Sequence, residues 1–224
     1  MPPLRGACLA DYHAQTKVTV VKLLLTDGAK QYTHITEEHG RCWVHEGRLY
    51  KKLSPRIELF QKEQTQVLDA FWYTYRQLRA YAEHPTPEET PRLTQPFEAL
   101  VSQTVSYEDL GRRLFATAEH QNELLVVRRH PEVPLHNNAA ELGARQRVRK
   151  RDASLPPRTV EGLAAWDTMP SLLATTKQRG VNFYHFVRDR LTGEGKIPRL
   201  AELIWRKAKE LNLGASWASP VPEG

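Results

Sequence analysis

The first strong hydrophobic pattern in the chain is a short, nearly continuous apolar run, KVTVVKLLLT, over residues 17–26. Its β-branched side chains and the Asp27-Gly28 stop favour a strand buried on both faces, as in a parallel or mixed sheet, and periodicity alone leaves a helix open. A brief second strand is predicted at Arg41–His45. A strand buried on both faces needs neighbours at both edges, and no other long strand follows. Most of the expected sheet is therefore missing from this chain.

From Pro55 the pattern changes to helical spacing. Apolar residues three, four or seven positions apart predict one long helix over Pro55–Glu83, followed by a proline-rich linker. Shorter helices are predicted around Phe97–Gln103 and after Ser106-Tyr-Glu-Asp109, a segment that resembles a capping box. His130-Pro131 ends the last of them. These segments predict a helical block of about eighty residues after the strands.

The second half of the chain is also predicted to be helical. Asn138 fits an N-cap, and Glu141, three residues later, can reach back to the cap amide. Further helices are predicted at Thr159–Arg179, with Gly180 as its stop, and at Asn182–Leu191. The last thirty residues hold one more amphipathic segment and a tail.

Composition narrows the class of protein. The 224 residues are 40% hydrophobic and 26% charged, with a mean hydropathy of −0.57. No run approaches the roughly 18 apolar residues of a membrane span, and the amino terminus lacks the apolar core of a secretory signal. Cys8 and Cys42 cannot build a disulfide framework, which favours a reducing cytoplasm. We therefore expect a cytoplasmic protein with no membrane partner.

The charge balance is basic, with 32 Lys and Arg against 26 Asp and Glu, a net charge of +6 and a pI near 9.4. Between Glu141 and Arg158, six basic residues face two acidic ones. On a helix these side chains form two rows that suit phosphates, and the alternative is an ordinary solvated helix face. The predicted DNA contacts are Arg145, Arg147, Arg149, Lys150 and Arg151. Such contacts would weaken with salt.

Two carboxylates are candidates for metal chemistry. Asp27 follows the buried strand, and Glu141 stands in the first turn of a helix. Carboxylates brought together from a strand end and a helix can hold magnesium for phosphoryl transfer. On spacing alone, a turn residue and a capping glutamate remain the stronger alternatives. Cys42-x-x-His45 is a single pair, whereas structural zinc needs four ligands, so we expect a buried cysteine beside Trp43 and no zinc.

Several sequence blocks together resemble one protein family. LLLTDGAKQY, CWVHEGRLYKKL, VPLHNNAAELGARQRVRKRD, WDT and GVNFYHFVRDRL are similar to the carboxyl-terminal part of the catalytic domain of a bacterial insertion-sequence transposase. The resemblance is to the DDE group of the IS-sixty-six-like kind and covers roughly residues 17–191. The most specific part of the resemblance is the CW-x-H block followed by the NN-x-x-E block, with helices between them.

The resemblance implies an α/β, mostly helical fold: an incomplete ribonuclease-H-like core with a helical insertion. The implied organisation is an irregular tail, the strand part of the core, the helical insertion, the helical part of the core with the third acid, and a carboxyl-terminal helix and tail. Their respective ranges are 1–16, 17–53, 54–130, 131–192 and 193–224.

The resemblance also implies roles for particular residues. By position, Asp27 resembles the second acid of the family and Glu141 the third, so both would be catalytic ligands of magnesium or manganese. His45 would be an accessory residue near a phosphate or a metal-bound water, with a packed histidine as the alternative. The chain departs from the family at His136, where many members have Asp, and at Leu142, where many have Arg.

The first acid of the family has no counterpart here. It should lie on a strand well upstream of Asp27, and Asp11 is only 16 residues before it, too close for three strands and their turns. The resemblance therefore implies a DNA transposase fragment: complete relatives cleave and transfer DNA strands with metal ions, and this chain is inactive alone.

The resemblance implies a bacterial protein associated with the nucleoid. Its expected partners are DNA at transposon ends and full-length transposase or a second copy of this chain. One alternative is a non-enzymatic inhibitor, derived from a truncated transposase, that binds DNA or transposase. Another is an unstable pseudogene product. Whether this chain is itself an enzyme stays open.

Overall fold

The computed structural model describes residues 14, 21–29, 32, 35–86, 88, 90–153 and 157–214. These residues form two compact units, one comprising those up to Asn137 and the other beginning at Asn138. The predicted class, α/β and mostly helical, is confirmed, and the ribonuclease-H-like core stays a prediction. No helix within these ranges combines the length and the apolar character that a membrane span requires.

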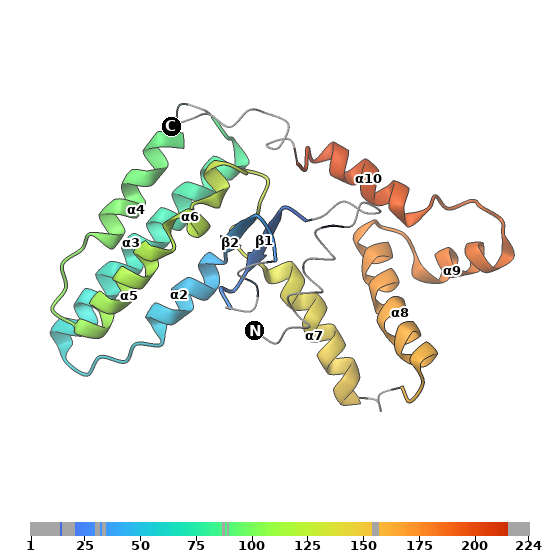
Figure 1. The fold of residues 1–224 in the computed structure, drawn as a ribbon, viewed down its shortest axis with the longest axis horizontal. Helices are drawn as coiled ribbons and strands as arrows, with labels where there is room; N and C mark the ends of the chain where they lie inside the picture. The colour runs from blue at the N-terminus through green and yellow to red at the C-terminus, as the bar shows by residue number, and fades with distance from the viewer. Residues whose placement is uncertain are drawn as a thin grey trace. The chain divides into compact units, whose positions relative to one another are not determined.

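The described residues of the first unit include a two-stranded parallel sheet. Strand β1 (Leu23–Thr26) pairs with β2 (Glu38–Arg41), so that Thr26 lies opposite Arg41 at the ends of both strands (Figure 1). The second strand was predicted at residues 41–45, and this is wrong beyond Arg41. Cys42 is the extended residue that precedes a helix, and its amide donates to the Thr26 carbonyl at 2.8 Å. Residues 17–20 of the predicted first strand lie outside the described residues.

Helices account for most of the other described residues of the first unit, and Figure 1 shows α2–α5 lying side by side with the sheet at one end of α2. Their bounds are α2 Trp43–Lys51, α3 Glu58–Glu83, η2 Thr90–Leu93, α4 Thr94–Val101, α5 Glu108–Glu119, α6 Gln121–Leu124 and η3 Val126–Arg128. Trp43 is the centre of the core: its ring lies 4.9 Å from that of Phe71 and 6.3 Å from that of Phe97, and its indole N–H donates to the Leu124 carbonyl at 2.8 Å. The long predicted helix is confirmed, although it begins at Glu58 rather than Pro55.

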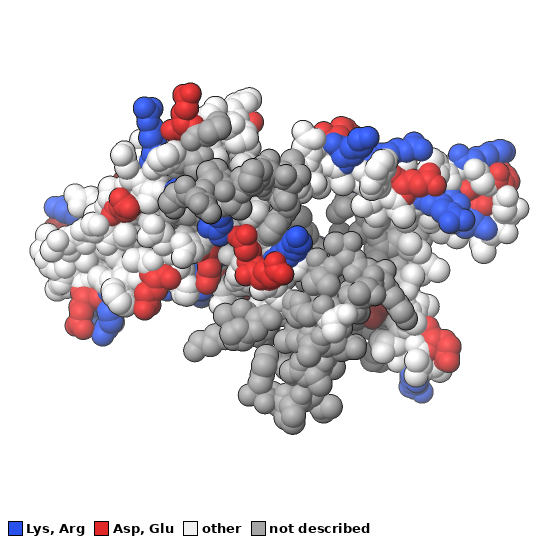
Figure 2. All heavy atoms as spheres, turned by 45° about the horizontal axis from the view of Figure 1, so that its top comes forward, with Lys and Arg blue, Asp and Glu red and all other residues white. Residues whose placement is uncertain are grey.

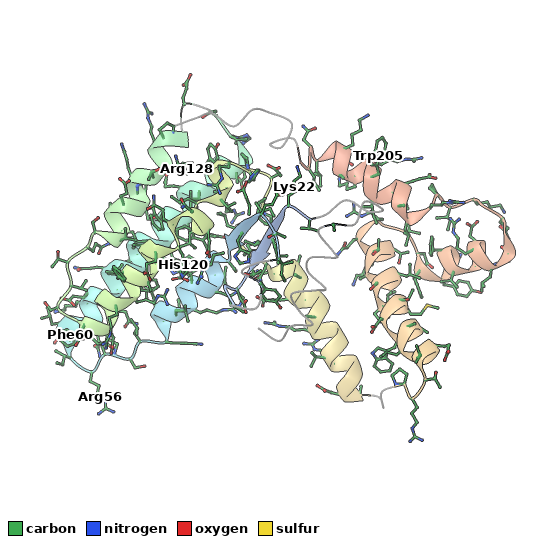
Figure 3. All side chains as sticks on the ribbon, in the orientation of Figure 1. Lys22, Arg56, Phe60, His120, Arg128 and Trp205 are labelled. Atoms are coloured by element: carbon green, nitrogen blue, oxygen red, sulfur yellow. The ribbon has the colours of Figure 1, made fainter. Side chains whose placement is uncertain are left out.

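The start of α5 shows how tertiary contacts replace local capping. Ser106-Tyr-Glu-Asp109 was predicted to cap this helix, but its N-cap is Tyr107, which makes no side-chain cap bond. Instead, the Glu63 carboxylate on α3 accepts the amides of Ser106 and Tyr107, both at 2.9 Å. Phe60, at the same end of α3 (Figure 3), stacks on the Tyr107 ring with centroids 5.1 Å apart. The capping-box prediction is therefore wrong, because a distant carboxylate takes its place.

The second unit is a set of helices: α7 Asn138–Ala153, α8 Val160–Gln178, α9 Phe183–Thr192 and α10 Leu200–Glu210. The predicted helix boundaries are close to these. Thr159 caps α8 by accepting the Gly162 amide at 3.0 Å, and Asn182 caps α9 by accepting the His185 amide at 3.1 Å. Gly180, with φ +69°, follows α8 in the left-handed conformation expected of a helix stop.

Candidate functional site

Asp27 lies in a tight turn directly after β1. Its side chain is exposed, and its Oδ1 accepts the Ala29 amide at 3.1 Å. The Gly28 amide donates to the Thr26 hydroxyl at 3.0 Å, and Gly28 has φ +85°, a conformation that favours glycine. The Asp-Gly pair therefore ends the strand as the sequence indicated. The turn also presents a carboxylate to solvent at the carboxyl end of a parallel strand.

The guanidinium of Arg41 lies beside this turn. Its Nε donates to Glu123 Oε2 at 2.9 Å, and its Nη1 is 3.7 Å from Glu46 Oε2. Only 13% of the Arg41 side chain is exposed. The end of β2 is thus tied to α6 through Glu123 and to α2 through Glu46.

Glu46 is the centre of a buried polar network. Its side chain is 1% exposed, and Oε1 accepts from both Arg113 and, at 2.8 Å, the Thr117 hydroxyl on α5. The Tyr50 hydroxyl lies 2.7 Å from that of Thr117. Burial raises the pKa of Tyr50 to about 12, so this phenol stays neutral at ordinary pH. A buried carboxylate of this kind requires paired cations and hydrogen bonds.

Two histidines flank the other carboxylate of the network. Glu123 Oε2 lies 4.0 Å from His39 Nδ1, and Glu123 Oε1 lies 3.4 Å from Nδ1 of His120, which Figure 3 labels. His39 also lies 3.3 Å from the Thr26 hydroxyl. Burial lowers the pKa of His39, Arg41 lowers it further, and Glu123 opposes both. A continuous set of polar contacts therefore runs from the residue before Asp27 to Tyr50.

His45 lies in the first turn of α2, partly buried, with Nε2 3.1 Å from Arg48 Nη1. The same turn meets the loop before α7, because the Trp43 amide donates to the Leu135 carbonyl at 3.0 Å. His136 follows Leu135 and is partly buried. The structure therefore brings the CW-x-H block against the loop that leads to the NN-x-x-E block.

Glu141 lies in the first turn of α7, in the second unit. Its side chain is 23% exposed, and its Oε2 lies 3.5 Å from Nη2 of Arg145 one turn later. Arg145 is 62% exposed, and Arg149 is exposed one turn beyond it. The predicted contacts Arg147, Lys150 and Arg151 lie on the same helix, but their side chains are outside the described set. The pairing of Asp27 with Glu141 in one site stays a prediction.

Charges are mixed elsewhere on the second unit. On α10, Glu202 lies 3.8 Å from Arg206, and Lys207 pairs with Glu210. Figure 2 shows basic and acidic side chains interspersed on the drawn face of this unit. The basic row of α7, which includes the exposed Arg145 and Arg149, therefore remains the best candidate for a polyanion contact on this unit.

Carboxylate oxygens are the candidate ligands for a metal centre in this chain. Mg²⁺ takes oxygen ligands, and the exposed carboxylate of Asp27 suits it chemically. However, among the ranges that the structure describes, no group of three or more His, Cys, Asp or Glu side chains is placed to hold a metal ion. Cys42 is buried as predicted and forms no disulfide. These ranges thus offer separate carboxylate ligands rather than an assembled metal site.

Sequence reasoning missed the network of Arg41, Glu46, Arg113 and Glu123. Glu46 and Arg113 are separated by 67 positions, and Arg41 and Glu123 by 82. No local spacing rule links such pairs, because each residue alone resembles an ordinary surface charge on a helix or strand. The only sequence signal for a buried Glu46 was its place beside Gly47, in a helix that also contains the large aromatic residues Trp43 and Tyr50.

Comparison with known proteins places the chain in a family. The family profile described as Transposase IS66 family matches residues 2–165, which include Asp27, His45 and Glu141. The uncharacterized protein y4jO of Sinorhizobium fredii (strain NBRC 101917 / NGR234) is 34% identical over 187 residues, which are 83% of this chain and 58% of that protein. This chain thus spans little more than half the length of that relative. No solved structure matches it. The chain belongs to the Transposase IS66 family.

Proposed function

We propose that this chain is the carboxyl-terminal part of a DDE-type DNA transposase catalytic domain. The observation that supports this proposal most is the family match over residues 2–165, which includes both candidate acids. Asp27 ends a parallel strand in an exposed turn, the usual place for an active-site carboxylate in sheets of this kind. The substrate class is DNA at the ends of a transposable element, in a cytoplasmic, nucleoid-associated setting.

Asp27 and Glu141 are the proposed ligands of Mg²⁺ or Mn²⁺, and His45 is a proposed accessory residue. When bound, the metal ions activate an attacking oxygen and stabilise the leaving oxygen of a phosphodiester. The first acid of the family has no counterpart in this sequence, since Asp11 is too near Asp27 to fill that role. This chain alone therefore does not cleave DNA. Magnesium-dependent nicking of the inverted repeats of its element, abolished in Asp27→Asn, would refute that inactivity and support the site.

The basic row of α7 is the proposed DNA contact. Arg145 and Arg149 are exposed and one turn apart, so one phosphate backbone lying along this face of α7 would meet both. Contacts to the backbone release counterions, and each one steepens the salt dependence of affinity by about 0.9 in log–log slope. Fluorescence anisotropy with a terminal-repeat duplex across a salt series measures this slope directly.

The double variant Arg145→Ala/Arg149→Ala should lower the slope by about 2 and weaken binding at low salt. The matched control is Arg76→Ala/Arg79→Ala, which removes two exposed arginines from α3 in the first unit. This control should leave the slope unchanged. Equal losses in both variants would indicate diffuse charge attraction and contradict an α7 contact.

A further inference from the structure

We propose that Arg41 is a positioning residue for the Asp27 carboxylate. Its guanidinium lies against the Asp27-Gly28-Ala29 turn, where Glu123 on α6 and Glu46 on α2 hold it. This inference rests on the proposed role of Asp27 as a metal ligand. It adds that the helices α2 and α6 determine where that carboxylate lies.

The contact between Arg41 and the turn is close. A β-carbon added at Gly28 would lie 2.6 Å from Nη1, 2.7 Å from Cζ and 3.1 Å from Nη2 of Arg41. The guanidinium therefore fills the space in which any other residue would place its side chain. Two constraints therefore require glycine at position 28: the guanidinium occupies the space for a side chain, and the backbone φ of +85° favours glycine. Asp27 is thus followed by a glycine against which the Arg41 guanidinium packs.

The pairing of the two strands also fixes the backbone of Arg41 relative to the turn. Its backbone pairs with that of Thr26, the residue before Asp27, and the next amide, Cys42, donates to the Thr26 carbonyl. Asp27 is consequently flanked by one residue that pairs with the Arg41 backbone and another that contacts its side chain. The turn cannot shift along the strand without losing one of these contacts.

The anchors of Arg41 suit arginine rather than lysine. Arginine presents a planar fork that can serve two carboxylates and lie flat on a third surface, whereas lysine has one point charge. Here the fork donates from Nε to Glu123, approaches Glu46 through Nη1 and rests on Gly28. Arg41→Lys keeps the charge near Asp27 but loses this geometry. Any change in the turn then reports positioning rather than a lost charge.

The test measures amide–water exchange by NMR at Gly28 and Ala29, whose N–H groups donate to Thr26 Oγ1 and Asp27 Oδ1 within the turn. Arg41→Lys should accelerate both rates by about tenfold, the worth of one lost charge-assisted hydrogen bond. The Cys42 amide, which reports strand pairing, should keep its rate. Arg129→Lys is the matched control, because Arg129 binds Glu38 at the opposite end of β2, and it should leave the turn unchanged.

Glu123→Gln is a second variant that lies outside the turn; it weakens one anchor of Arg41 together with the contacts of Glu123 with His39 and His120. It should accelerate exchange at Ala29 in the same direction by a smaller factor, and it provides the readout if Arg41→Lys fails to fold. Unchanged rates at Gly28 and Ala29 would overturn the inference. Equal acceleration at Cys42 would also overturn it, because it would show a general structural role.

A second measurement separates this inference from the proposed function. Mn²⁺ should selectively broaden the amide resonances of Asp27–Ala29, and Asp27→Asn should abolish the effect. If Arg41→Lys leaves the turn formed about a third of the time, the Mn²⁺ concentration for half-broadening rises about threefold. Absence of selective broadening in the unaltered protein would refute Asp27 as a ligand. The exchange rates would still decide the role of Arg41.

Discussion

Replacement of the buried carboxylate in Glu46→Gln should be among the most destabilising isosteric changes in the first unit. The glutamine keeps the volume and one acceptor oxygen but removes the negative charge between Arg41 and Arg113. Their side chains are only 13% and 19% exposed, so water cannot replace the lost partner fully. The substitution therefore leaves two half-buried cations close to each other without their shared counter-ion.

The magnitude follows from the contact distances. At an effective dielectric constant of about 20, charges 3.7 Å apart, as between Arg41 and Glu46, attract by roughly 4 kcal/mol before desolvation is counted. Removal of one partner from a buried pair usually costs about 3–5 kcal/mol. Because glutamine still accepts from Thr117, we expect a loss of about 3 kcal/mol in the free energy of unfolding. Urea denaturation followed by circular dichroism measures it.

Two further variants make this prediction refutable. Glu58→Gln removes an exposed carboxylate, paired with Lys62 on α3, and should change stability by less than about 0.5 kcal/mol. In an Arg113→Met background, Glu46→Gln should cost about 1–2 kcal/mol less than in the unaltered chain, because one of the two cations beside Glu46 is already gone. A loss below about 1 kcal/mol, or strict additivity of the two substitutions, would show that the network contributes little to stability.

Three other predictions test the packing, capping and charge of the first unit. Gly47→Ala should destabilise the protein by about 1–2 kcal/mol, because the added β-carbon would lie 2.8 Å from the Trp72 ring. The control is Gly111→Ala, whose β-carbon would lie 3.6 Å from its nearest neighbour; it should be neutral or stabilising in the same denaturation assay. Glu63→Gln should lower the melting temperature, because only one oxygen remains to accept the two amides at the start of α5. Burial disfavours ionised Glu38, but its arginine and histidine partners outweigh this and lower its pKa below 4.5. The stabilisation from Glu38 is then complete above pH 4.5 and lost as the pH falls through the lowered pKa, so Glu38→Gln should flatten the acid side of the stability profile.

Helices were predictable from the sequence because their signals are local. The apolar spacing over residues 55–83 located α3, the glycine stop at Gly180 marked the end of α8, and Asn182 marked the start of α9. Each of these signals lies within one or two turns of the element that it defines. Propensity, capping and spacing act over the same range, so the chain itself contains the information.

The end of β2 was mispredicted because local signals conflict there. Val44 and Trp43 favour a strand by composition, yet Trp43 begins α2 and its ring packs on Phe71 from α3. The capping of α5 was mispredicted for the same reason, because Glu63, which accepts amides at the start of this helix, lies on another helix. In both places a contact between distant segments decides the local structure, and no short window of sequence contains it.

The candidate acids were identified in another way. Their spacing favoured a turn residue and a cap, and Asp27 does form a side-chain turn with Ala29. Only the resemblance to transposases raised them above that interpretation, and the family match supports the resemblance. A turn residue and a metal ligand are compatible, because a carboxylate that accepts one amide through Oδ1 keeps further lone pairs for a cation.

Within the described residues, the sheet that presents Asp27 has two strands of four residues, and a pair of strands alone is marginal in water. Contacts with the helices therefore stabilise it. Both ends of β2 are bound to one short segment: Arg41 pairs with Glu123, and Glu38 pairs with Arg129. The helical region between the two candidate acids thus does more than separate them in sequence. Because it clamps the strand beside Asp27 at both ends, it determines the place of the carboxylate on which the proposed chemistry depends.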